Sequence, residues 1–395
     1  MVEKTLKAGW RRVKFGDVVQ LAKGRSRDPL ADGLERYVGL EHLEPGDLRI
    51  RSWGNVADGV TFTNVFQPGQ VLFGKRRAYQ RKVAVADFAG VCSGDIYVLE
   101  TKDTQNLLPE LLPFICQTEA FFNHAVGTSA GSLSPRTNWT SLAEFEFALP
   151  PTAAQIVILS VLTNYSALDD AYTSANLCAL NLLGSHANAI FAKRKYDAVS
   201  FEDILIRQPQ SGLYKAQDFL GRGTKIVNMG ELFGFDTIAD SIDMKRMELT
   251  DEEVAKYQLT PNDLLFGRRS IVLEGAGKCS MVGSLQESVI FESSILRVTV
   301  NPEIALPKFI FEWLRSPKGT QQITRIRSFT TVAGITGSDL KKVVVPVMPI
   351  KEQLAIGNEL SSMRASVDAL TERQAANRGL KENILEEVLG GWNVH

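Results

Sequence analysis

The sequence predicts an α+β protein made of two tandem domains of mixed strands and short helices, separated by two long helices that form an intramolecular antiparallel coiled coil. Three observations lead to this prediction. The chain has 395 residues, which is too long for one ordinary domain. Groups of residues from its first half return in the same order in its second half. Each half ends in a long stretch with helical spacing of its apolar residues.

The repeat is defined by three segments. Residues 13–17 share Val, Phe and Asp with residues 199–203, and residues 68–76 are repeated closely at 261–269. Residues 151–156 are repeated at 349–354. The distance between the copies grows from 186 to 198 residues along the chain. Insertions in loops of the second copy would produce this drift, so the two copies are expected to share one fold.

Each copy of the repeat begins with about 150 residues that are rich in strand and turn signals. Short β-prone runs at 82–85, 96–99 and 294–300 are separated by Gly, Pro, Asp and Asn. Helices are expected at 107–125 and 306–326, because each region opens with a Leu-Pro pair that suits a helix start. We therefore predict one domain at residues 1–150 and a second at 196–349.

The two long helices are predicted at residues 151–195 and 350–395. Residues 152–192 contain no proline, and their apolar residues alternate at three and four positions as in a coiled-coil seam. A helix of about 38 residues is roughly 57 Å long, which suits a spacer. The expected seam of the first helix is Ile158, Val161, Tyr165, Leu168, Tyr172, Ala175, Ala179 and Leu182, and that of the second is Ile356, Leu360, Met363, Val367 and Leu370.

A narrow apolar stripe of this length needs a partner, and the nearest partner is the other helix of the same chain. The alternative is that each helix packs separately on its own domain. Gln374 and Asn377 lie where the second stripe weakens. They either set the register of the pair or mark the place where another protein takes over the contact.

The order of these segments resembles the specificity subunit of Type I restriction-modification systems. The resemblance rests on GWRRVKFGDVV at 9–19, YVGLEHLEPGDL at 37–48, the run from PGQVLFGKRR to GDIYVL at 68–99, and FALPPTAAQIVI at 147–158. PNDLLFGRRS, ESSILRV and VPVMPIKEQLAIG match more tersely in the second copy. Residues 222–249 depart from the pattern as an insertion without a clear counterpart.

The resemblance implies a cytoplasmic, non-catalytic reader of double-stranded DNA without a cofactor. Each target recognition domain would read one half of a split target, and the paired helices would hold the two halves at a fixed separation. The helices would also dock two methyltransferase (M) subunits per chain, through the seam and its surroundings at Ile158, Tyr165, Tyr172, Ile356, Met363 and Leu370. Motor nuclease (R) subunits would join the same assembly.

Basic residues that recur at equivalent places are the candidates for DNA contacts. The first copy contains a basic loop with one aromatic residue, at Lys75, Arg76, Arg77, Tyr79, Arg81 and Lys82. Such a loop suits phosphate contacts and reading of guanine by arginine, although a solvated charged loop is the alternative. The second copy repeats it at Arg268, Arg269 and Lys278.

Further candidates lie in loops beside these. Arg25 and Arg27 are placed to meet DNA or solvent, and Arg136 and Ser338 precede the last strand of each domain, where a plain turn is the alternative. Arg325 and Arg327 end a one-sided basic stretch. Composition alone does not favour nucleic acid, because the net charge is −1, but a local patch matters more than the total.

Motifs for catalysis, metal binding and cofactor binding are missing from the sequence. GAGKCS at 275–280 lacks the first glycine and the final Ser or Thr of a phosphate-binding loop, and its lysine aligns with Lys82 between strands. The four histidines do not have zinc-site spacing, and the four cysteines stand alone, as in a reduced protein. We expect no metal and no catalytic residue here.

Two other functions compete with DNA reading. The doubled domains could clamp two copies of a partner as a protein–protein scaffold of a bacterial defence complex, without sequence-specific DNA binding. Alternatively, the chain could be a nuclease with an unrecognised site. With 44% hydrophobic and 23% charged residues and no long apolar run, the sequence predicts a globular protein without a membrane span.

Overall fold

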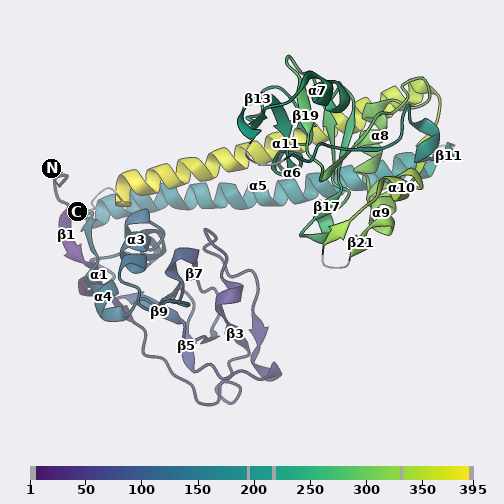
Figure 1. The fold of residues 1–395 in the computed structure, drawn as a ribbon. Helices are drawn as coiled ribbons and strands as arrows, with labels where there is room; N and C mark the ends of the chain where they lie inside the picture. The colour runs from purple at the N-terminus through teal and green to yellow at the C-terminus, as the bar shows by residue number, and fades with distance from the viewer. Residues whose placement is uncertain (1–5, 194–195, 216–218, 330–331, 391–395) are drawn as a thin grey trace. The chain divides into compact units, whose positions relative to one another are not determined.

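The computed structural model describes residues 6–193, 196–215, 219–329 and 332–390 (Figure 1). The chain forms two compact units, the first made of Met1–Thr173 with Glu372–His395 and the second of Ser174–Thr371. Both units mix helices and strands, and each contains part of both long helices. The fold class predicted from the sequence is confirmed.

The described residues of the first unit form three small sheets. Its first and last strands, β1 (Arg11–Lys14) and β10 (Glu146–Leu149), pair antiparallel and close the domain beside the start of the long helix. A four-stranded sheet has the order β2-β9-β6-β7, and a second has the order β4-β3-β8-β5. These strands are β2 (Val19–Leu21), β3 (Arg36–Val38), β4 (Gly54–Asn55), β5 (Asn64–Phe66), β6 (Val71–Gly74), β7 (Val83–Val85), β8 (Gly90–Cys92) and β9 (Ile96–Thr101).

Short helices cover the β2-β9-β6-β7 sheet and bury a large apolar core with it. The helices are α1 (Phe15–Val18), α2 (Leu112–Ile115), α3 (Glu119–Gly127) and α4 (Trp139–Ala143). Phe15, Phe73 and Phe121 are fully buried in this core, which also includes Leu162 and Leu385 from the two long helices. Burial of a phenylalanine side chain contributes about 2 kcal/mol, so this cluster anchors the domain to its helices.

The second unit repeats the same plan. Its first and last strands, β11 (Asp197–Ser200) and β23 (Val344–Val347), again pair antiparallel. The remaining sheets have the orders β12-β20-β16-β18-β14, β15-β13-β19 and β17-β22-β21. These strands are β12 (Gln210–Ser211), β13 (Leu220–Val227), β14 (Thr237–Ile238), β15 (Arg246–Met247), β16 (Leu264–Gly267), β17 (Arg269–Ser270), β18 (Cys279–Val282), β19 (Val289–Phe291), β20 (Ile295–Val298), β21 (Ser328–Phe329) and β22 (Ala333–Gly334).

The helices of the second domain show where one expectation was wrong. They are α6 (Met229–Gly234), α7 (Asp251–Tyr257), α8 (Pro307–Leu314), α9 (Pro317–Ile326) and α10 (Gly337–Lys341). The single helix expected at 306–326 is divided into α8 and α9, because Ser316 caps a new helix by accepting a hydrogen bond from the Gly319 N–H and Pro317 lacks an N–H. The helix expected at 107–125 is divided in the same way at the cap Thr118.

Residues 222–249 have a counterpart in the first unit, contrary to the sequence interpretation. Strand β13 runs parallel to β19 and antiparallel to β15, just as β3 runs parallel to β8 and antiparallel to β4. The element after the central strand is α6 in one unit and a single 3₁₀ turn, Leu40–His42, in the other. The sequences diverged around a conserved strand order, so the residue pattern did not reveal the match.

One buried glutamine joins each domain to its long helix. Gln155 is fully buried; its Oε1 accepts from the Leu108 N–H at 2.9 Å, and its Nε2 donates to the Asn106 and Pro150 carbonyls at 2.7 and 2.9 Å. Gln353 makes the same three bonds, to Leu306, Ile304 and Met348. The repeated Pro-x-x-x-Gln pattern therefore has a structural reason, since an amide satisfies buried backbone donors and acceptors at once.

The long helices are α5 (Thr152–Lys193) and α11 (Ile350–Leu385), and α11 continues as a π-helical turn, Glu386–Gly390. They run antiparallel. In the first unit Asn377 Nδ2 donates to the Tyr165 carbonyl at 3.1 Å and Arg378 Nε donates to Asp169 at 2.6 Å. In the second unit His186 and Glu359 lie 2.7 Å apart. The alternative of two separately packed helices is wrong.

The seam of α11 is apolar as expected, with Ile356, Leu360 and Val367 buried and Met363 and Leu370 half-buried. Every second residue of the seam expected for α5 is wrong: the actual seam residue is the next one along the chain. Val161, Leu168 and Leu182 are 37%, 44% and 63% exposed, whereas Leu162 and Leu183 are buried. The two intervening seam positions are Asp169, which is held by Arg378 and Gln374, and Asn176. The sequence interpretation chose apolar Leu168 over this aspartate, and the predicted seam was therefore displaced by one residue.

Ile158, Tyr165 and Tyr172 of α5 are half-buried, as the seam requires. Gln374 and Asn377 make contacts with α5 themselves, which favours the register-setting role over a contact with another protein. Within the described residues, no helix is both long enough and apolar enough to span a membrane.

Candidate nucleic-acid interface

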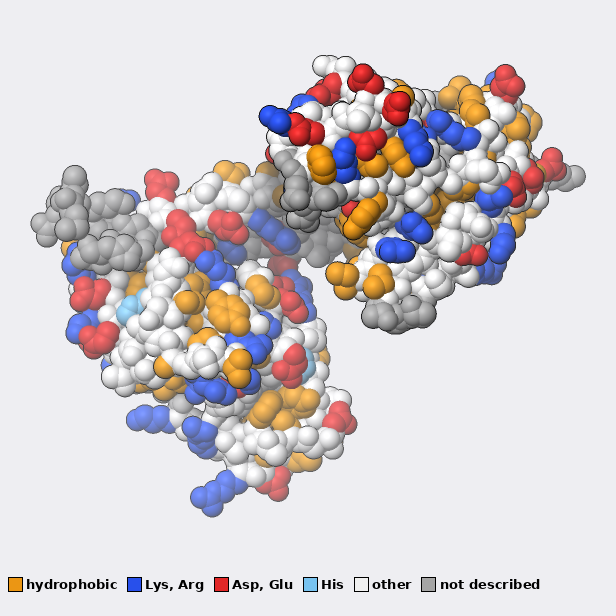
Figure 2. All heavy atoms as spheres, viewed as in Figure 1, with side chains coloured by type: hydrophobic (Ala, Val, Ile, Leu, Met, Phe, Trp, Pro, Cys, Tyr) orange, Lys and Arg blue, Asp and Glu red, His pale blue; other side chains and the backbone are white. Residues whose placement is uncertain are grey.

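Basic and acidic side chains are interspersed on the visible face of both units (Figure 2). Many of the basic side chains make ion pairs with acids of the same unit. A candidate for DNA contact therefore has to be judged from what its charged group already touches. Arginines whose donors are used internally differ in this respect from arginines whose donors face solvent.

In the first domain, the candidates after strand β6 and before α4 come together at one corner. Arg77 N donates to the Pro135 carbonyl at 2.7 Å, and Thr137 N donates to the Lys75 carbonyl at 3.0 Å. Arg76 and Arg136 thus face each other as an isolated antiparallel bridge. These backbone hydrogen bonds join residues 75–77 to residues 134–137. We call the two segments together the basic corner.

The side chains of the basic corner share two oxygen acceptors. Asp95 accepts from Arg136 Nε at 2.8 Å and from Arg76 Nη1 at 3.2 Å. The Ser134 hydroxyl accepts from Nη2 of both Arg76 and Arg77, at 3.0 and 3.3 Å. Partial burial raises the pKa of Asp95, but the hydrogen bonds from Arg136 and Arg76 outweigh it, so the pKa lies below its usual value. Asp95 is therefore a carboxylate at neutral pH.

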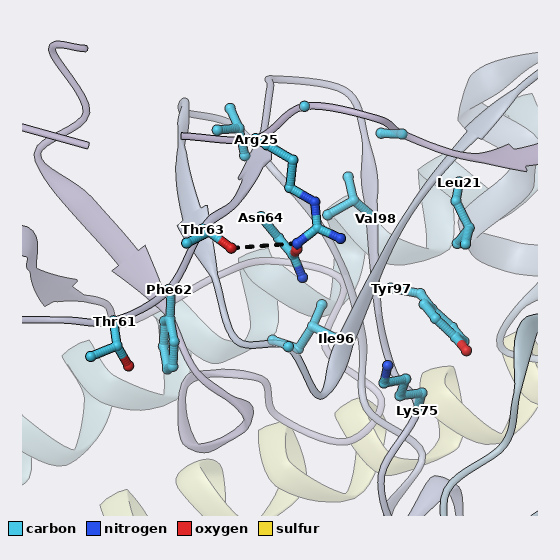
Figure 3. Close-up of a pocket in the computed structure, with 14 residues that line it drawn as sticks. Leu21, Arg25, Thr61, Phe62, Thr63, Asn64, Lys75, Ile96, Tyr97 and Val98 are labelled. Carbon is cyan, nitrogen blue, oxygen red and sulfur yellow. Dashed lines mark hydrogen bonds between the residues drawn. The ribbon is translucent and has the colours of Figure 1, made fainter. Parts of the chain in front are cut away.

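Arg25 and Lys75 line a hollow of about 430 Å³ beside the basic corner. Figure 3 shows Arg25 at one wall with Thr63 and Asn64, and Lys75 near Tyr97 at the other. The Arg25 guanidinium donates to Asn64 Oδ1 and to the Thr63 hydroxyl. The Lys75 ammonium lies 4.6 Å from the centre of the Tyr97 ring, and burial lowers its pKa. The hollow offers two cations and an amide to an anionic group.

The rest of the predicted loop is arranged around a 3₁₀ turn, Ala78–Gln80. Arg77 and Arg81 flank it with φ angles of 54° and 56°, a left-handed conformation that non-glycine residues adopt rarely. Arg81 forms an ion pair with Glu119 and lies over the Phe122 ring, and the Lys82 ammonium donates to the Leu40 carbonyl at 2.7 Å. Tyr79 is 53% exposed at the tip.

These contacts divide the candidates of the first domain. Arg81 and Lys82 hold the loop to the domain and are only partly available to DNA. Tyr79 and Arg27 face solvent. The sequence analysis grouped all of them as one basic loop, because the contacts of neighbouring side chains cannot be told apart from the sequence alone.

In the second domain, Arg268 and Ser338 are brought together. They line a hollow of about 210 Å³ with Lys341, Gln208 and Ser211. Arg268 N donates to the Ser294 carbonyl at 2.7 Å, and the Arg268 carbonyl accepts from Ile335 N at 3.0 Å. Lys341 also forms an ion pair with Glu202 at 2.5 Å. The hollow therefore presents one arginine, one lysine and three hydroxyl-bearing residues, Ser211, Thr336 and Ser338.

The other candidates of the second domain are dispersed. Lys278 forms an ion pair with Asp236 at 3.3 Å, and its carbonyl accepts from Gly267 N as the Lys82 carbonyl does from Gly74 N. Lys278 thus precedes strand β18, where the sequence had aligned it with Lys82. Arg327 donates to the Ala276 and Glu274 carbonyls. Arg269 on β17 and Arg325 on α9 are exposed.

Three residues at the candidate site were not predicted as part of it: Asp95, Asn64 and Tyr97. Asp95 lies 19 residues from Arg76 and 41 from Arg136, so no local pattern connects them. Its position directly before β9 is the only sequence signal. Among the described residues, no group of three or more His, Cys, Asp or Glu side chains could hold a metal ion.

Comparison with known proteins agrees with this geometry. Residues 7–175 match the family model of the Type I restriction modification DNA specificity domain. The chain is 26% identical over 194 residues to the Type I restriction enzyme EcoKI specificity subunit of Escherichia coli K12, and 29% identical over 194 residues to the EcoDI specificity subunit of Escherichia coli. These alignments cover 49% and 47% of this chain and 41% of each relative, so the matched part spans less than half of their length.

A solved structure described as bearing on complex assembly and conformational transition of the Type I R-M system has a similar fold. The TM-score is 0.58 at 17% identity, and the superposition covers 97% of this chain and 98% of the other. At this identity the likeness concerns the fold alone, and it includes both domains and both long helices.

Proposed function

We propose that the chain is a member of the family of Type I restriction-modification specificity subunits, and that it is the DNA-recognition subunit of such a complex. Its two target recognition domains, residues 1–150 and 196–349, each read one half of a split target on double-stranded DNA. The helices at 151–195 and 350–395 hold the two readers apart. Because the complex acts on the DNA of its cell, we place it in the cytoplasm.

The observation that carries the proposal is a repeated framework with different side chains at its basic end. Both domains close with the same strand pair and the same buried glutamine. In both domains, backbone hydrogen bonds join the segment after the central strand (β6 or β16) to the segment before the last short helix (α4 or α10). At this place the first domain has Arg76, Asp95 and Arg136, whereas the second has Arg269, Ser294 and Gly334. Two similar frames with different polar ends suit two different DNA sequences.

The long helices suit the role of a spacer. A straight helix of 42 residues such as α5 is roughly 63 Å long. Half-site spacing on DNA follows from the distance between two readers, so a stiff antiparallel pair would impose one spacing and leave the bases between unread. The polar contacts of Asn377 and Gln374 support a single register of the pair.

The proposal assigns no reaction and no cofactor to this chain. Methyl transfer to adenine would belong to methyltransferase subunits, two per chain, docked along the helices near Ile158, Tyr165, Tyr172, Ile356, Met363 and Leu370. Val161, Leu168 and Leu182 support such docking, because they leave apolar side chains exposed on α5 instead of in the seam. Motor nuclease subunits would join the same complex.

The first test is single-molecule sequencing of modified bases in the host DNA with the gene present and with the gene deleted. We expect a split motif with a methylated adenine in each half, which is lost on deletion. The complete complex should also bind a duplex with this motif more tightly than a scrambled duplex, with an affinity that falls steeply as salt increases. Absence of both the motif and the specific binding would favour the protein–protein scaffold instead.

A variant pair makes this test specific to the candidate residues. Arg25→Ala with Lys75→Ala removes the two cations of the first hollow, and Arg12→Ala is a matched control on β1 whose arginine pairs with Glu146 at 3.8 Å. The double variant should weaken DNA binding by the complex and lower its salt dependence, whereas the control should leave both unchanged. Equal effects of the two would remove the hollow from the interface.

A further inference from the structure

The basic corner of the first domain holds one arginine in an unusual way. Arg136 N donates to the Ala130 carbonyl at 3.0 Å, and the Arg136 carbonyl accepts from Ala130 N at 3.0 Å. On its other side Arg136 faces Arg76. Its backbone is thus held between two neighbouring segments, although it lies in a loop. A residue fixed on both sides can aim its side chain with little backbone freedom left to lose on binding.

The side chain of Arg136 is held by one nitrogen only. Nε donates to Asp95 Oδ1 at 2.8 Å, and the side chain is 51% exposed. Nη1 and Nη2 have no hydrogen-bond partner among the residues that the structure describes. The free edge of the guanidinium therefore lies opposite the nitrogen that Asp95 holds. This edge carries two N–H donors side by side, which is the arrangement that a bidentate contact requires.

The neighbouring arginines do not offer the same edge. Arg76 uses Nη1 on Asp95 and Nη2 on Ser134, and its Nε is buried without a partner. Arg77 uses Nη2 on Ser134, and its Nε is buried as well. Both guanidinium groups are thus committed to the domain. Their positive charge remains close to Arg136 and would still attract the phosphate backbone.

Asp95 is well placed to position Arg136. Its N–H donates to the Ser93 hydroxyl at 3.2 Å, and its carbonyl accepts from Lys75 N at 3.0 Å. An arginine side chain has considerable rotamer entropy, part of which is lost whenever the side chain is fixed by a ligand. Because Asp95 already holds Nε, less of that entropy remains to be lost when a base is bound.

The second domain lacks this arrangement at the equivalent place. The equivalent positions are identified from backbone hydrogen bonds. Lys75 N donates to the Asp95 carbonyl in the first domain, and Arg268 N donates to the Ser294 carbonyl in the second. Likewise Arg76 faces Arg136 as Arg269 faces Gly334. A serine and a glycine therefore replace the acid and the exposed arginine. Whatever base the first domain reads here, the second cannot read it by the same contact.

We propose that Arg136 is the base-reading arginine of the first domain, binding O6 and N7 of a guanine in the major groove through Nη1 and Nη2, and that Asp95 is its positioning residue. The proposal rests on the DNA-reading function proposed above. Guanine is the expected base because its two major-groove acceptors match a bidentate arginine edge. Arg76 and Arg77 are parts of the frame that support Arg136 and the local charge.

The test uses the complete complex and a duplex bearing its methylated motif. Each guanine of both half-sites is replaced in turn by 7-deazaguanine, which removes the N7 acceptor, and the dissociation constant is measured at one salt concentration. For the unaltered complex we expect a loss of roughly 10- to 100-fold at one guanine read by Arg136. Arg136→Ala should bind the normal duplex more weakly by a similar factor and become insensitive to the substitution at that guanine alone.

Three further variants separate base reading from charge and from structure. Arg136→Lys keeps the charge but cannot bind both acceptors in the same fork, so it should keep the salt dependence and lose the discrimination. Asp95→Ala should also lose discrimination although Arg136 is present, and Asp95→Asn should restore part of it, since its amide oxygen can still accept from Nε. Arg12→Ala, which removes another acid-paired arginine outside the basic corner, should leave the discrimination unchanged. Thermal unfolding of each variant establishes that the domain remains folded.

The proposal is overturned if folded Arg136→Ala keeps the full sensitivity to 7-deazaguanine at every guanine, or if neither half-site contains a guanine. It is also overturned if Asp95→Ala leaves the discrimination ratio unchanged, because Asp95 would then not position Arg136. Failure of the proposed function would look different: the unaltered complex would show no motif and no sequence preference at all.

Discussion

The buried amide of Gln155 offers a sharp test of how each domain is joined to its helix. We consider Gln155→Leu, which keeps a side chain of similar size and removes its polar atoms. The substitution removes the acceptor of the Leu108 N–H and the donor to the Asn106 and Pro150 carbonyls. All three groups belong to the region where the domain meets the first turn of α5.

The magnitude follows from the groups left without a partner. A buried donor or acceptor that loses its partner costs about 1–3 kcal/mol. The Leu108 N–H carries the full penalty, whereas carbonyls tolerate partial satisfaction more readily. We therefore expect the first unit to lose about 3–5 kcal/mol of unfolding free energy, which is a large fraction of the stability of a typical domain. Gln353→Leu should destabilise the second unit by a similar amount, since the three bonds are repeated there.

The assay is urea unfolding of the full chain, combined with hydrogen exchange of the peptide that contains Leu108. Because the two units need not unfold together, the exchange measurement assigns the change to the first unit. Ser160→Ala, at an exposed position of the same helix, is the control and should change the stability by less than about 0.5 kcal/mol. A loss below about 1 kcal/mol in Gln155→Leu, or unchanged exchange at Leu108, would refute the reasoning.

Four other predictions concern the helices, the charges and the thiols. Asn377→Leu replaces a buried polar seam residue and should raise the unfolding free energy by about 1 kcal/mol while weakening the register; a lower melting temperature would contradict this. Hydrogen bonds from Arg246 and Lys225 lower the pKa of Glu287 from 4.5 to about 2. A lowered folded-state pKa contributes stability that is present above pH 4.5 and lost as the pH falls toward 2, so the difference in stability between the unaltered protein and Glu287→Gln should shrink over this window in acid unfolding. Arg325→Ala should weaken binding of the complex to all DNA sequences alike and lower the slope of log affinity against log salt by about 1, whereas a change in sequence preference would contradict a phosphate contact. Cys178 is exposed while Cys92, Cys116 and Cys279 are buried with raised pKa values, so a maleimide should label Cys178 alone in the folded chain; rapid labelling of a second thiol would show that one of the three is not buried.

The larger features of the fold were readable from the sequence because they leave periodic or repeated signals. The long helices were expected at 151–195 and 350–395, and the structure has Thr152–Lys193 and Ile350–Leu385 with its π-helical turn; residues 194–195 and 391–395 lie outside the described residues. Prolines stand just before both helices, at Pro150 and Pro151 and at Pro346 and Pro349, and no proline interrupts either helix. The repeated glutamines, too, were visible as a pattern, although their reason was not.

Where the sequence interpretation was wrong, a polar residue has a role in the tertiary structure that cannot be predicted from its residue type. Asp169 occupies a seam position because Arg378 and Gln374, more than 200 residues away in the chain, hold it there. Thr118 and Ser316 cap new helices inside stretches that composition alone left continuous. Strand β13 revealed its counterpart β3 through pairing and not through residue identity.

The sequence by itself determined the duplication, the two long helices, the resemblance to Type I specificity subunits and the approximate set of basic residues, since local periodicity and recurrence are properties of the chain. Only the tertiary structure decided which of those arginines have free donors. Arg76, Arg77, Arg81 and Arg136 are alike in sequence terms. They differ because Asp95, Ser134 and Glu119, from distant segments, hold the guanidinium nitrogens of Arg76, Arg77 and Arg81, whereas Asp95 holds Arg136 through Nε alone and leaves its Nη1–Nη2 edge open. Hydrogen bonding is short-ranged and directional, so the availability of a donor depends on its neighbours in space and not on its neighbours in the chain.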